Sequence, residues 1–464
     1  MSSESTVESR GTSLLSELRF RGLFHQCTHE ETLGTHLAAG EPSLRRAYVG
    51  YDPTADSLTI GNLVTIMLLR HWQDAGHTPV VLMGGGTGLI GDPSGKTAER
   101  TLRTRAEVDA NVRSQMRIFG RLLDFSESRP NRAILVNNID WLAKLSYLDA
   151  LRDIGKHFSV NMMIQKDSVR DRLNNRDQGI SYTEFSYMIL QAYDFLHLHR
   201  AMGVTMQMGG SDQWGNMVGG CDLIRRSAGT SGHSSAESTS QVDSRLGESG
   251  HHEAFALTCP LVTKADGGKF GKTESGAVWL TAERTSPYQF YQFWLNTADA
   301  DVSRFLRIFT VMPHVEIERL EAQHTADPGK REAHRALARH ITELLHGADE
   351  ADKAEQATRA LFGKSSGGGD GPFVLPPDLI ASAPSSDHDR ALLDGPGMAL
   401  LDLLPQTTLA KSKSEARTLL AQNSISVNGH VAAADARVSA ASLIDGGLIA
   451  LRKGKKNWHL TKWA

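Results

Sequence analysis

The stretch that decides the fold is residues 46–91, RAYVGYDPTADSLTIGNLVTIMLLRHWQDAGHTPVVLMGGGTGLIG. Its pattern predicts a strand at Ala47–Tyr51, a helix at Ile60–Ala75 and a second strand at Pro79–Met83, before the glycine run 84–86. Strands and helices that alternate in this way indicate a parallel α/β sheet. Ligands of such sheets bind at the carboxyl ends of the strands, so the turn after the first strand is the first candidate site.

The helix that follows this turn has an N-terminus suited to a phosphate. Thr59, Gly61 and Asn62 lie around its first turn, where unpaired N–H groups and the helix dipole favour negative charge. A glycine in the first turn also lets a phosphate approach the backbone closely. Many strand-to-helix junctions share these features, so the turn alone is a weak signal.

A second candidate phosphate-binding segment, Lys269–Thr273 (KFGKT), lies far downstream in a glycine-flanked loop. A mobile loop could bring Lys269 and Lys272 onto a polyphosphate, where they would stabilise charge on a leaving pyrophosphate. Lys96 and Arg100, after the string GDPSG, are further candidates. A lone K-x-x-K is typical of a solvated surface loop, and KFGKT lacks the spacing and the following helix of a P-loop.

The composition is that of a globular protein with more than one domain. The chain has 464 residues, 40% of them hydrophobic, and a net charge of −3, so any nucleic-acid surface must be a local basic patch. No apolar run has the length of a membrane span, and the polar N-terminus resembles neither a signal nor a transit peptide. The three cysteines show no metal or redox spacing and fit a reducing compartment. These features predict a cytoplasmic enzyme.

The first two segments together resemble the two signature elements of class I aminoacyl-tRNA synthetases. Longer strings resemble the bacterial-type tyrosyl-tRNA synthetases. They are GYDPTADSL (50–58), GLIGDPSGKTAER (88–100), GKHFSVNMM (155–163), TEFSYMILQAYDF (183–195), GGSDQWGN (209–216) and LVTKADGGKFGKTESG (261–276). These strings are spread over residues 48–300, and with the tail the resemblance covers most of the chain.

A polar stripe in the segment 183–195 predicts part of the amino-acid site. Tyr187, Gln191 and Asp194 are spaced i, i+4 and i+7 in an otherwise apolar helix, so they share one face that lines either a site or a buried network. The resemblance implies that Tyr187 and Gln191, with Asp92, hold the α-ammonium of the substrate. It also implies that Asp194 and Tyr48 bind the phenol of tyrosine.

The resemblance implies three sets of functional residues, with ATP as a substrate and Mg²⁺ to neutralise its phosphates. The sequence itself shows no protein metal cluster, and the nineteen histidines show no ligand spacing. The implied sets are catalytic Thr54, Thr59, Asn62, Lys96, Arg100, Lys269, Lys272 and Thr273; tyrosine-binding Tyr48, Asp92, Tyr187, Gln191, Asp194 and Gln213; and ATP-binding Gly50, Asp52, Gly61, Gly210, Asp212 and Lys272.

One position departs from the family pattern. The signature that normally reads His-Ile-Gly-His is here Thr59-Ile60-Gly61-Asn62. The amide of Asn62 can still donate where an imidazole nitrogen would, but Thr59 is shorter and cannot become cationic. We hypothesise that Thr59 keeps part of the phosphate contact, with Thr54 and the lysines of KFGKT.

The C-terminal part predicts a separate RNA-binding unit. Residues 411–429 read as a short helix, a strand and an Asn-Gly hairpin turn. Residues 397–464 hold nine Lys and Arg against four Asp and Glu, a local charge of 9 − 4 = +5 in a chain that is acidic overall. Such a basic module suits a phosphate backbone, although a solubilising tail would carry similar charge. The pattern resembles the small RNA-binding domain that ends bacterial-type tyrosyl-tRNA synthetases.

The predicted architecture is an α/β protein in four parts. A helical lead-in at 13–40 precedes the sheet, further strands are expected at 134–136 and 204–208, and the polar insert 228–252 is predicted to be disordered. The parts are a Rossmann-like parallel-sheet catalytic domain at 1–286, a helical middle domain at 287–362, a linker at 363–396 and a small α+β RNA-binding domain at 397–464.

Three functions are compatible with the sequence. The leading one is the activation of L-tyrosine with ATP and its transfer to tRNA(Tyr), in a homodimer without membrane contact, as the family implies. The second is a paralogue that binds tyrosine and RNA without charging, for which Thr59 is the only support. The third is a ligase that transfers activated tyrosine to an acceptor other than tRNA, which the basic tail opposes.

Overall fold

The computed structural model describes residues 14–39, 41, 45–92, 103–166, 169–170, 173, 180–229, 254–265, 267, 270–273, 276–362, 375, 380, 384–444, 447–454 and 457–464. Of the predicted site residues, Lys96, Arg100 and Lys269 lie outside these ranges, and Lys272 and Thr273 are described by their backbone alone. The predicted insert 228–252 also lies outside them, except for residues 228–229, which end a helix.

The described chain forms two compact units. The first comprises Met1–Thr285 and Thr297–Leu337, and the second Ser286–Asn296 and Ala338–Ala464. The helices predicted over 287–362 are present but are divided between the two units. Apolar periodicity predicts a helix, but it does not tell which core the apolar face of that helix joins.

The first unit is built on a six-stranded sheet of order β1-β6-β5-β2-β3-β4. Neighbouring strands are parallel except for β1, which runs antiparallel to β6. The predicted Rossmann-like parallel sheet is therefore confirmed. The strands are β1 (Gln26–Cys27), β2 (Arg46–Tyr51), β3 (Thr78–Met83), β4 (Ile134–Asn137), β5 (Val204–Gly210) and β6 (Phe255–Cys259).

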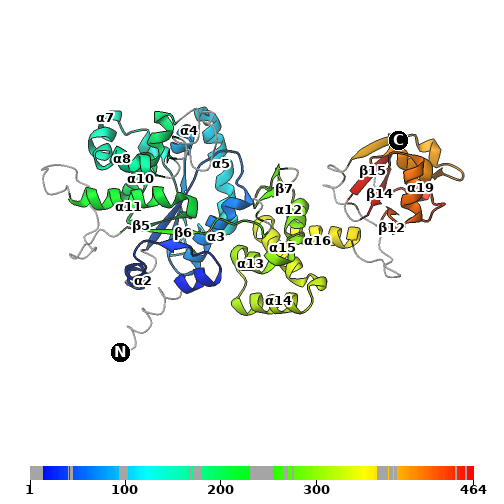
Figure 1. The fold of residues 1–464 in the computed structure, drawn as a ribbon, viewed down its shortest axis with the longest axis horizontal. Helices are drawn as coiled ribbons and strands as arrows, with labels where there is room; N and C mark the ends of the chain where they lie inside the picture. The colour runs from blue at the N-terminus through cyan, green and yellow to red at the C-terminus, as the bar shows by residue number, and fades with distance from the viewer. Residues whose placement is uncertain are drawn as a thin grey trace. The chain divides into compact units, whose positions relative to one another are not determined.

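Helices cover both faces of this sheet (Figure 1). α10 and α11 lie on the face that carries Tyr48, whose ring centroid is 5.4 Å from that of Phe195. α3 and α5 lie on the opposite face, where the ring of Tyr51 is 4.9 Å from that of Phe119. The helices of the unit are α2 (Glu30–Ala38), α3 (Ile60–Asp74), α4 (Thr87–Ile90), α5 (Arg105–Leu122), α6 (Ile139–Leu142), α7 (Tyr147–Asp149), α8 (Val160–Gln165), α10 (Tyr182–Met202), α11 (Trp214–Gly229), α13 (Asp299–Phe309), α14 (His314–Ala326) and the start of α15 (Glu332–His346).

The strand order reverses between β2 and β5. From β2 the chain adds β3 and β4 on one side of the sheet, and β5 and β6 on the other. The loops that leave the carboxyl ends of β2 and β5 therefore run in different directions, which leaves a crevice between them. This switch point is where the fold positions a ligand.

The N-terminal region differs from the continuous helix predicted over 13–40. Residues 14–20 are helical, but Gly22 has a φ of 70° and lies in the turn that ends the helix. The chain then adds β1 to the edge strand β6, and α2 begins at Glu30. A two-residue strand has too short an apolar pattern to be recognised, so its partner strand decides its conformation.

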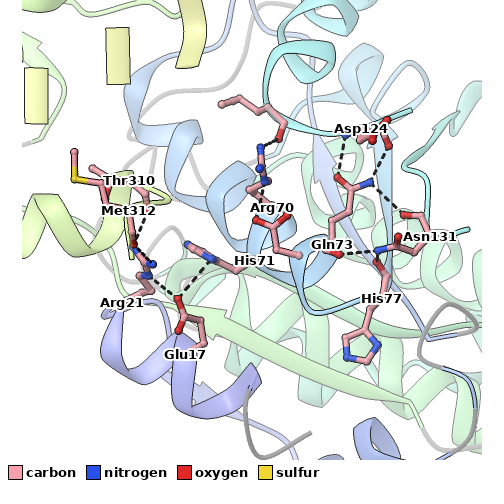
Figure 2. Close-up of polar contacts among 12 residues, drawn as sticks. Glu17, Arg21, Arg70, His71, Gln73, His77, Asp124, Asn131, Thr310 and Met312 are labelled. Carbon is pink, nitrogen blue, oxygen red and sulfur yellow. Dashed lines mark hydrogen bonds and ion pairs between the residues drawn. The ribbon is translucent and has the colours of Figure 1, made fainter. Parts of the chain in front are cut away.

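A buried ion-pair network fastens this N-terminal helix to the segment that follows α13 (Figure 2). Arg21 is 3% exposed and donates to the carbonyl oxygens of Thr310 and Met312 at 2.9 and 2.6 Å. Its Nε donates to Glu17 at 2.7 Å, and Glu17 also bonds His314. Burial raises the pKa of Glu17, but Arg21 and His314 lower it, and the net pKa is lowered.

We expect Arg21→Met to destabilise the first unit by about 3 kcal/mol, because it leaves two carbonyl groups without their donor and the half-buried Glu17 without its arginine partner. Arg19→Met, two residues away, is the matched control, since Arg19 is exposed and its ion pair with Glu30 is worth less than about 1 kcal/mol. Denaturant titration followed by tryptophan fluorescence measures both. Equal midpoints for the two variants would contradict the role assigned to Arg21.

The second unit combines helices with an antiparallel-rich sheet of order β12-β11-β14-β15-β9. Its core is apolar and includes the buried Leu400, Leu420, Ile449 and Trp463. The elements are α12 (Pro287–Leu295), the end of α15, α16 (Ala348–Phe362), β9 (Ser385–His388), β10 (Met398–Ala399), α18 (Leu400–Leu403), α19 (Lys413–Ala421), β11 (Ile425–Val427), β12 (His430–Val431), β13 (Arg437–Val438), β14 (Leu448–Lys453) and β15 (Asn457–Trp463).

The C-terminal hairpin forms where the sequence predicts it, and a strand of the same sheet lies upstream of residue 397. Asn428 and Gly429 both have positive φ, 46° and 83°, as the tight turn between β11 and β12 requires. β9, inside the predicted linker 363–396, pairs in parallel with β15. Its sequence SSDH has no apolar alternation, so nothing in the pattern indicates a strand.

Candidate active site

A cavity of about 460 Å³ lies at the switch point between β2 and β5. Its walls come from the ends of these strands, the first turn of α3, the inner face of α10 and the 3₁₀ turn Ser211–Gln213. Fourteen predicted site residues line it: Tyr48, Gly50, Asp52, Thr54, Thr59, Gly61, Asn62, Asp92, Tyr187, Gln191, Asp194, Gly210, Asp212 and Gln213. They include each predicted residue whose side chain, or glycine backbone, is described.

A buried phenol and a buried carboxylate share the interior of this cavity. Tyr48 is 1% exposed and Asp194 is 2% exposed. Trp141 Nε1 and Asn138 Nδ2 donate to the two oxygens of Asp194 at 2.8 and 2.9 Å. Burial raises the pKa of Asp194 to about 7, although these two hydrogen bonds lower it. The Tyr48 hydroxyl has no hydrogen-bond partner among the described residues, so a ligand hydroxyl could accept from it and donate to Asp194.

A second carboxylate, Asp52, joins the end of β2 to α4 and α10. One of its oxygens accepts from the Tyr187 hydroxyl at 2.8 Å, and the other accepts from the Thr87 hydroxyl at 2.7 Å. Asn138 Nδ2 lies 3.0 Å from Thr87 Oγ1 as well as 2.9 Å from Asp194. The two carboxylates of the cavity are therefore connected through Thr87 and Asn138.

Sequence reasoning missed Thr87, Asn138 and Trp141. A signal existed for Asn138, because it follows the predicted strand 134–136 and parallel strands present ligand-binding groups at their carboxyl ends. Thr87 and Trp141 gave no signal. A threonine after a glycine run and a tryptophan on a short helix are typical of ordinary packing.

Two glutamines and an aspartate form a polar wall beside this network. Gln213 Nε2 donates to Asp92 at 3.1 Å, and Gln213 Oε1 accepts from Gln191 Nε2 at 3.4 Å. Gln191 Oε1 is buried and has no hydrogen-bond partner among the described residues. With the Tyr187 oxygen one helical turn away, this wall presents several acceptors, which suits a ligand ammonium group.

At the other end of the cavity, Thr59 caps α3 and orients Asn62. Asn62 Oδ1 accepts from both the N–H and the hydroxyl of Thr59, each at 3.0 Å. A backbone N–H can only donate, so this contact assigns the oxygen of the Asn62 amide and leaves its Nδ2 to donate to a ligand. The hydroxyl proton of Thr59 is already used in this contact. Thr59 therefore orients Asn62 and does not offer its own hydroxyl proton to the cavity.

The KFGKT segment packs against the first turn of α3. Lys272–Thr273 and Gly276–Ala277 form the two-stranded sheet β7–β8. Val278 N donates to Gly271 O at 3.0 Å, and Val278 O accepts from Ile60 N at 3.1 Å. A Cβ added to Gly271 would lie 2.9 Å from Ile60 Cγ1, and the φ of 81° also favours glycine. The two signature segments, far apart in the sequence, are thus in direct contact.

Phe270 fixes the same segment to α13. Its ring centroid lies 4.9 Å from that of Phe305 and 5.2 Å from that of Phe309. Upstream, the Asp301 carboxylate accepts from Ala265 N at 3.1 Å. The loop that carries the lysines is therefore held at α13 through its aromatic residue and at α3 through its backbone.

Two family models match the chain. One, described as "tRNA synthetases class I (W and Y)", matches residues 43–363, and the other, "Tyrosine--tRNA ligase SYY-like C-terminal domain", matches residues 382–461. Curated relatives include the tyrosine–tRNA ligase of Roseiflexus castenholzii, 46% identical over 97% of this chain and 99% of that protein. The tyrosine–tRNA ligase of Bacillus caldotenax is 44% identical over 97% of this chain and 100% of that protein.

Solved structures share the fold. The C-terminally truncated mitochondrial tyrosyl-tRNA synthetase of Aspergillus nidulans is 28% identical, with a TM-score of 0.66 over 77% of this chain and 99% of that one. The corresponding protein of Coccidioides posadasii is 31% identical, with a TM-score of 0.63 over 76% and 96%. The strings quoted from the sequence, the family models and the relatives agree: the chain belongs to the class I aminoacyl-tRNA synthetases, in the family of bacterial-type tyrosyl-tRNA synthetases.

Proposed function

We propose that the chain is an active tyrosine–tRNA ligase. The observation that carries the proposal is the pair Tyr48 and Asp194, a donor and an acceptor for a phenol inside the cavity that α3 borders. Phenylalanine would leave the Tyr48 hydroxyl without a partner and Asp194 without the hydrogen bond from the phenol. Tyrosyl-tRNA synthetases are the established example of a discrimination of about 10⁴–10⁵ obtained in this way without editing. The curated relatives are tyrosine–tRNA ligases, and this chain matches them over nearly their whole length. This match favours a ligase over a binding paralogue.

Tyrosine would lie with its ammonium group against the polar wall. Tyr187, Gln191 and Asp92 supply oxygen acceptors there, and Gln213 holds Asp92 in place by its hydrogen bond. Asp52 was predicted as an ATP ligand, but its bond to Tyr187 supports a role at the amino group of tyrosine. The tyrosine carboxylate then points towards the end of the cavity where α3 begins.

ATP would occupy the end of the cavity at α3. Asn62 Nδ2 and the first-turn N–H groups suit the phosphates, and Gly61 leaves them room, since an added Cβ there would meet only Thr59 Oγ1 at 3.5 Å. Asp212 would face the ribose. Burial raises the pKa of Asp212, although its hydrogen bond with Gln213 lowers it. The remaining implied groups are Gly50, Gly210, Thr54, Lys96, Arg100, Lys269, Lys272 and Thr273.

In the proposed reaction a carboxylate oxygen of tyrosine attacks the α-phosphorus of ATP in line. A new P–O bond forms, the bond to the β-phosphate bridge breaks, and pyrophosphate leaves with its electron pair. A terminal ribose hydroxyl of the tRNA then attacks the tyrosyl carbonyl carbon, and AMP leaves. The chain contributes positioning and charge stabilisation, because the reacting groups all belong to the substrates.

No residue of the chain need act as a covalent nucleophile or as a dedicated magnesium ligand. Burial raises the pKa of Cys27 to about 11 and the pKa values of Cys221 and Cys259 to about 12, which keeps these thiols protonated. Mg²⁺ would enter as the ATP complex, held mainly by phosphate oxygens. Among the described residues, the side-chain cluster close enough to hold a metal lies outside this cavity.

We expect Phe270→Ala to lower the rate constant of tyrosyl-adenylate formation about 10-fold while leaving the dissociation constant of tyrosine unchanged. The reason is that Phe270 contacts α13 and not the cavity. Its loss therefore loosens the KFGKT segment and displaces its lysines, while the residues that bind tyrosine keep their positions. Stopped-flow fluorescence with varied tyrosine and ATP separates the two quantities. Phe293→Ala, an aromatic truncation in the second unit, is the control; a weaker tyrosine affinity in Phe270→Ala would contradict this assignment.

The tRNA would contact the basic C-terminal part. Its nine basic residues include two paired with carboxylates, Lys413 with Asp402 at 2.6 Å and Lys453 with Glu415 at 2.9 Å. The surplus of +5 remains, which suits a phosphate backbone. Binding that depends on this charge weakens steeply as the salt concentration rises.

We also propose a homodimer in the cytoplasm. Support for the dimer comes from a set of exposed apolar side chains around α7, α8 and the start of α10, since patches of this kind mark interfaces. The exposed side chains are Tyr147, Leu148, Leu151, Val160, Met162, Ile164 and Tyr182.

No helix in the described part of the chain is long and apolar enough to cross a membrane.

Two assays on the purified protein test the function. Pyrophosphate exchange that depends on tyrosine reports activation, and labelled tyrosine retained on bulk tRNA reports transfer. A tyrosine–tRNA ligase is positive in both assays. A binding paralogue is negative in both, and a ligase for another acceptor exchanges pyrophosphate but charges no tRNA. If the wild type shows no pyrophosphate exchange and Thr59→His does, the native protein is not a working synthetase.

A further inference from the structure

Three helices of the first unit bring two histidines and an aspartate together, away from the cavity. Asp299 begins α13, His324 lies near the end of α14, and His334 lies in the first turn of α15. One possible ligand atom from each of the three lies within 4.8 Å of the others. The two imidazole ring centroids are 5.3 Å apart at an interplanar angle of 67°. None of the three residues lines the cavity described above.

The hydrogen bond of His324 fixes its tautomer. Its Nε2 lies 3.0 Å from the backbone carbonyl oxygen of Asp299, which can only accept, so Nε2 carries the proton. The other nitrogen, Nδ1, then has a lone pair, and it is buried without a hydrogen-bond partner among the described residues. Metal-binding histidines commonly have this arrangement, in which one nitrogen donates to a carbonyl and the other faces the metal.

His334 is the buried member of the cluster. Its side chain is 0% exposed, and neither ring nitrogen forms a hydrogen bond of normal geometry within the described residues. Nε2 nevertheless lies 3.2 Å from Asp299 Oδ1. A buried imidazole therefore lies against a carboxylate without a hydrogen bond of normal geometry, and a cation between them would bond to both.

Two imidazoles and one carboxylate are a donor set for a borderline-soft divalent cation. Zn²⁺ takes three such protein ligands and a water in a tetrahedral site, whereas Mg²⁺ and Ca²⁺ prefer oxygen ligands alone. We propose that Asp299, His324 and His334 form a Zn²⁺ site that ties α13, α14 and α15 together. The rim residue Arg331, 3.8 Å from Asp299 Oδ1, competes with the cation for this oxygen.

The sequence predicted no metal site because these residues form no recognised spacing. The ligands are contributed by three separate helices, and only the tertiary fold brings them within reach of one ion. The site is independent of the proposed catalytic function, and its test needs no activity measurement.

Zn²⁺ titration against a metallochromic chelator tests the site in the full-length protein after removal of bound metal. The wild type should bind one Zn²⁺ that His324→Gln and Asp299→Asn each weaken by about 100-fold. His430→Gln, which removes an exposed histidine of the second unit, should bind as the wild type does. Binding elsewhere, for example at His251 and His252, persists in every variant and so cancels in the comparison.

A second readout separates ligand loss from misfolding. Co²⁺ in place of Zn²⁺ should give the wild type the strong visible absorption of a four-coordinate site, and the two ligand variants should lack it. Saturating Zn²⁺ should raise the Tm of the wild type and leave that of Asp299→Asn unchanged, with equal Tm values for the two in chelator. Absence of stoichiometric binding in the wild type, or wild-type affinity in His324→Gln or in Asp299→Asn, would overturn the proposal.

Discussion

Replacing Asp194 by asparagine is expected to lower the preference for tyrosine over phenylalanine by about 10²–10³-fold, expressed as the ratio of kcat/KM values in pyrophosphate exchange. The carboxylate accepts from Trp141 and Asn138 and has lone pairs left for the substrate phenol. An asparagine NH₂ group would face one of these donors and would lose the charge-assisted bond to the phenol. The loss falls on tyrosine alone, because phenylalanine has no hydroxyl to bind.

Asp222→Asn is the matched control for this prediction. It makes the same chemical change on α11, where Asp222 pairs with Arg225 at 2.8 Å outside the cavity. Its tyrosine preference should equal that of the wild type. A preference retained in Asp194→Asn would remove Asp194 from the selectivity mechanism and leave Tyr48 as the discriminating group.

The pH dependence of the same residue gives an independent check. Burial raises the pKa of Asp194 from 3.8 to about 7, so the folded protein binds this proton more tightly than the unfolded chain does. The stability from this group is therefore complete below pH ~4 and is lost as the pH rises through 7. Tyrosine, which donates to the carboxylate form, should bind more tightly at pH 8 than at pH 6. Calorimetry should find this difference in the wild type and not in Asp194→Asn.

Asn62→Ala is expected to lower the rate of tyrosyl-adenylate formation by about 10²–10³-fold, the usual cost of one donor that stabilises a transition-state charge. The change removes the Nδ2 donor at the N-terminus of α3, while the residues that contact tyrosine keep their positions. The dissociation constant of tyrosine should therefore stay at the wild-type value. Stopped-flow measurement of adenylate formation and equilibrium tyrosine binding provide the two quantities.

Thr59→Val is the matched comparison, because it removes only the hydroxyl that helps to orient Asn62 and keeps the N–H bond at 3.0 Å. Its rate should fall by less than about 10-fold. If Thr59→Val proved as damaging as Asn62→Ala, Thr59 itself would contact the phosphate, as the sequence first suggested.

The sequence was sufficient for four of the six strands of the sheet, β2 to β5, and for most residues that line the cavity. The apolar runs of β2 and β3 and the helix between them are long and regular, so local pattern and tertiary structure agree there. Tyr187, Gln191 and Asp194 could be grouped because one helix carries them at fixed spacing. The resemblance to a known family then connected segments that no local rule could connect.

The remainder depends on contacts between distant segments. Asn138 and Trp141 orient Asp194 from α6 and its N-cap, and only the hydrogen-bond distances show this role. β9 is a strand because β15 offers it an edge, and its own residues show no strand pattern. The hydrogen bond from the Thr59 hydroxyl to Asn62 is likewise visible only in three dimensions.

The network at Arg21 has a consequence for synthesis on the ribosome. Arg21 leaves the exit tunnel early, but its acceptor carbonyls belong to residues 289 and 291 positions further along the chain. At about 5–20 residues per second, its guanidinium waits roughly 15–60 s for them. The helix at 14–20 therefore cannot reach its final packing until Thr310 and Met312 have been translated. A product that terminates before Thr310 keeps an Arg21 that lacks both of its backbone acceptors.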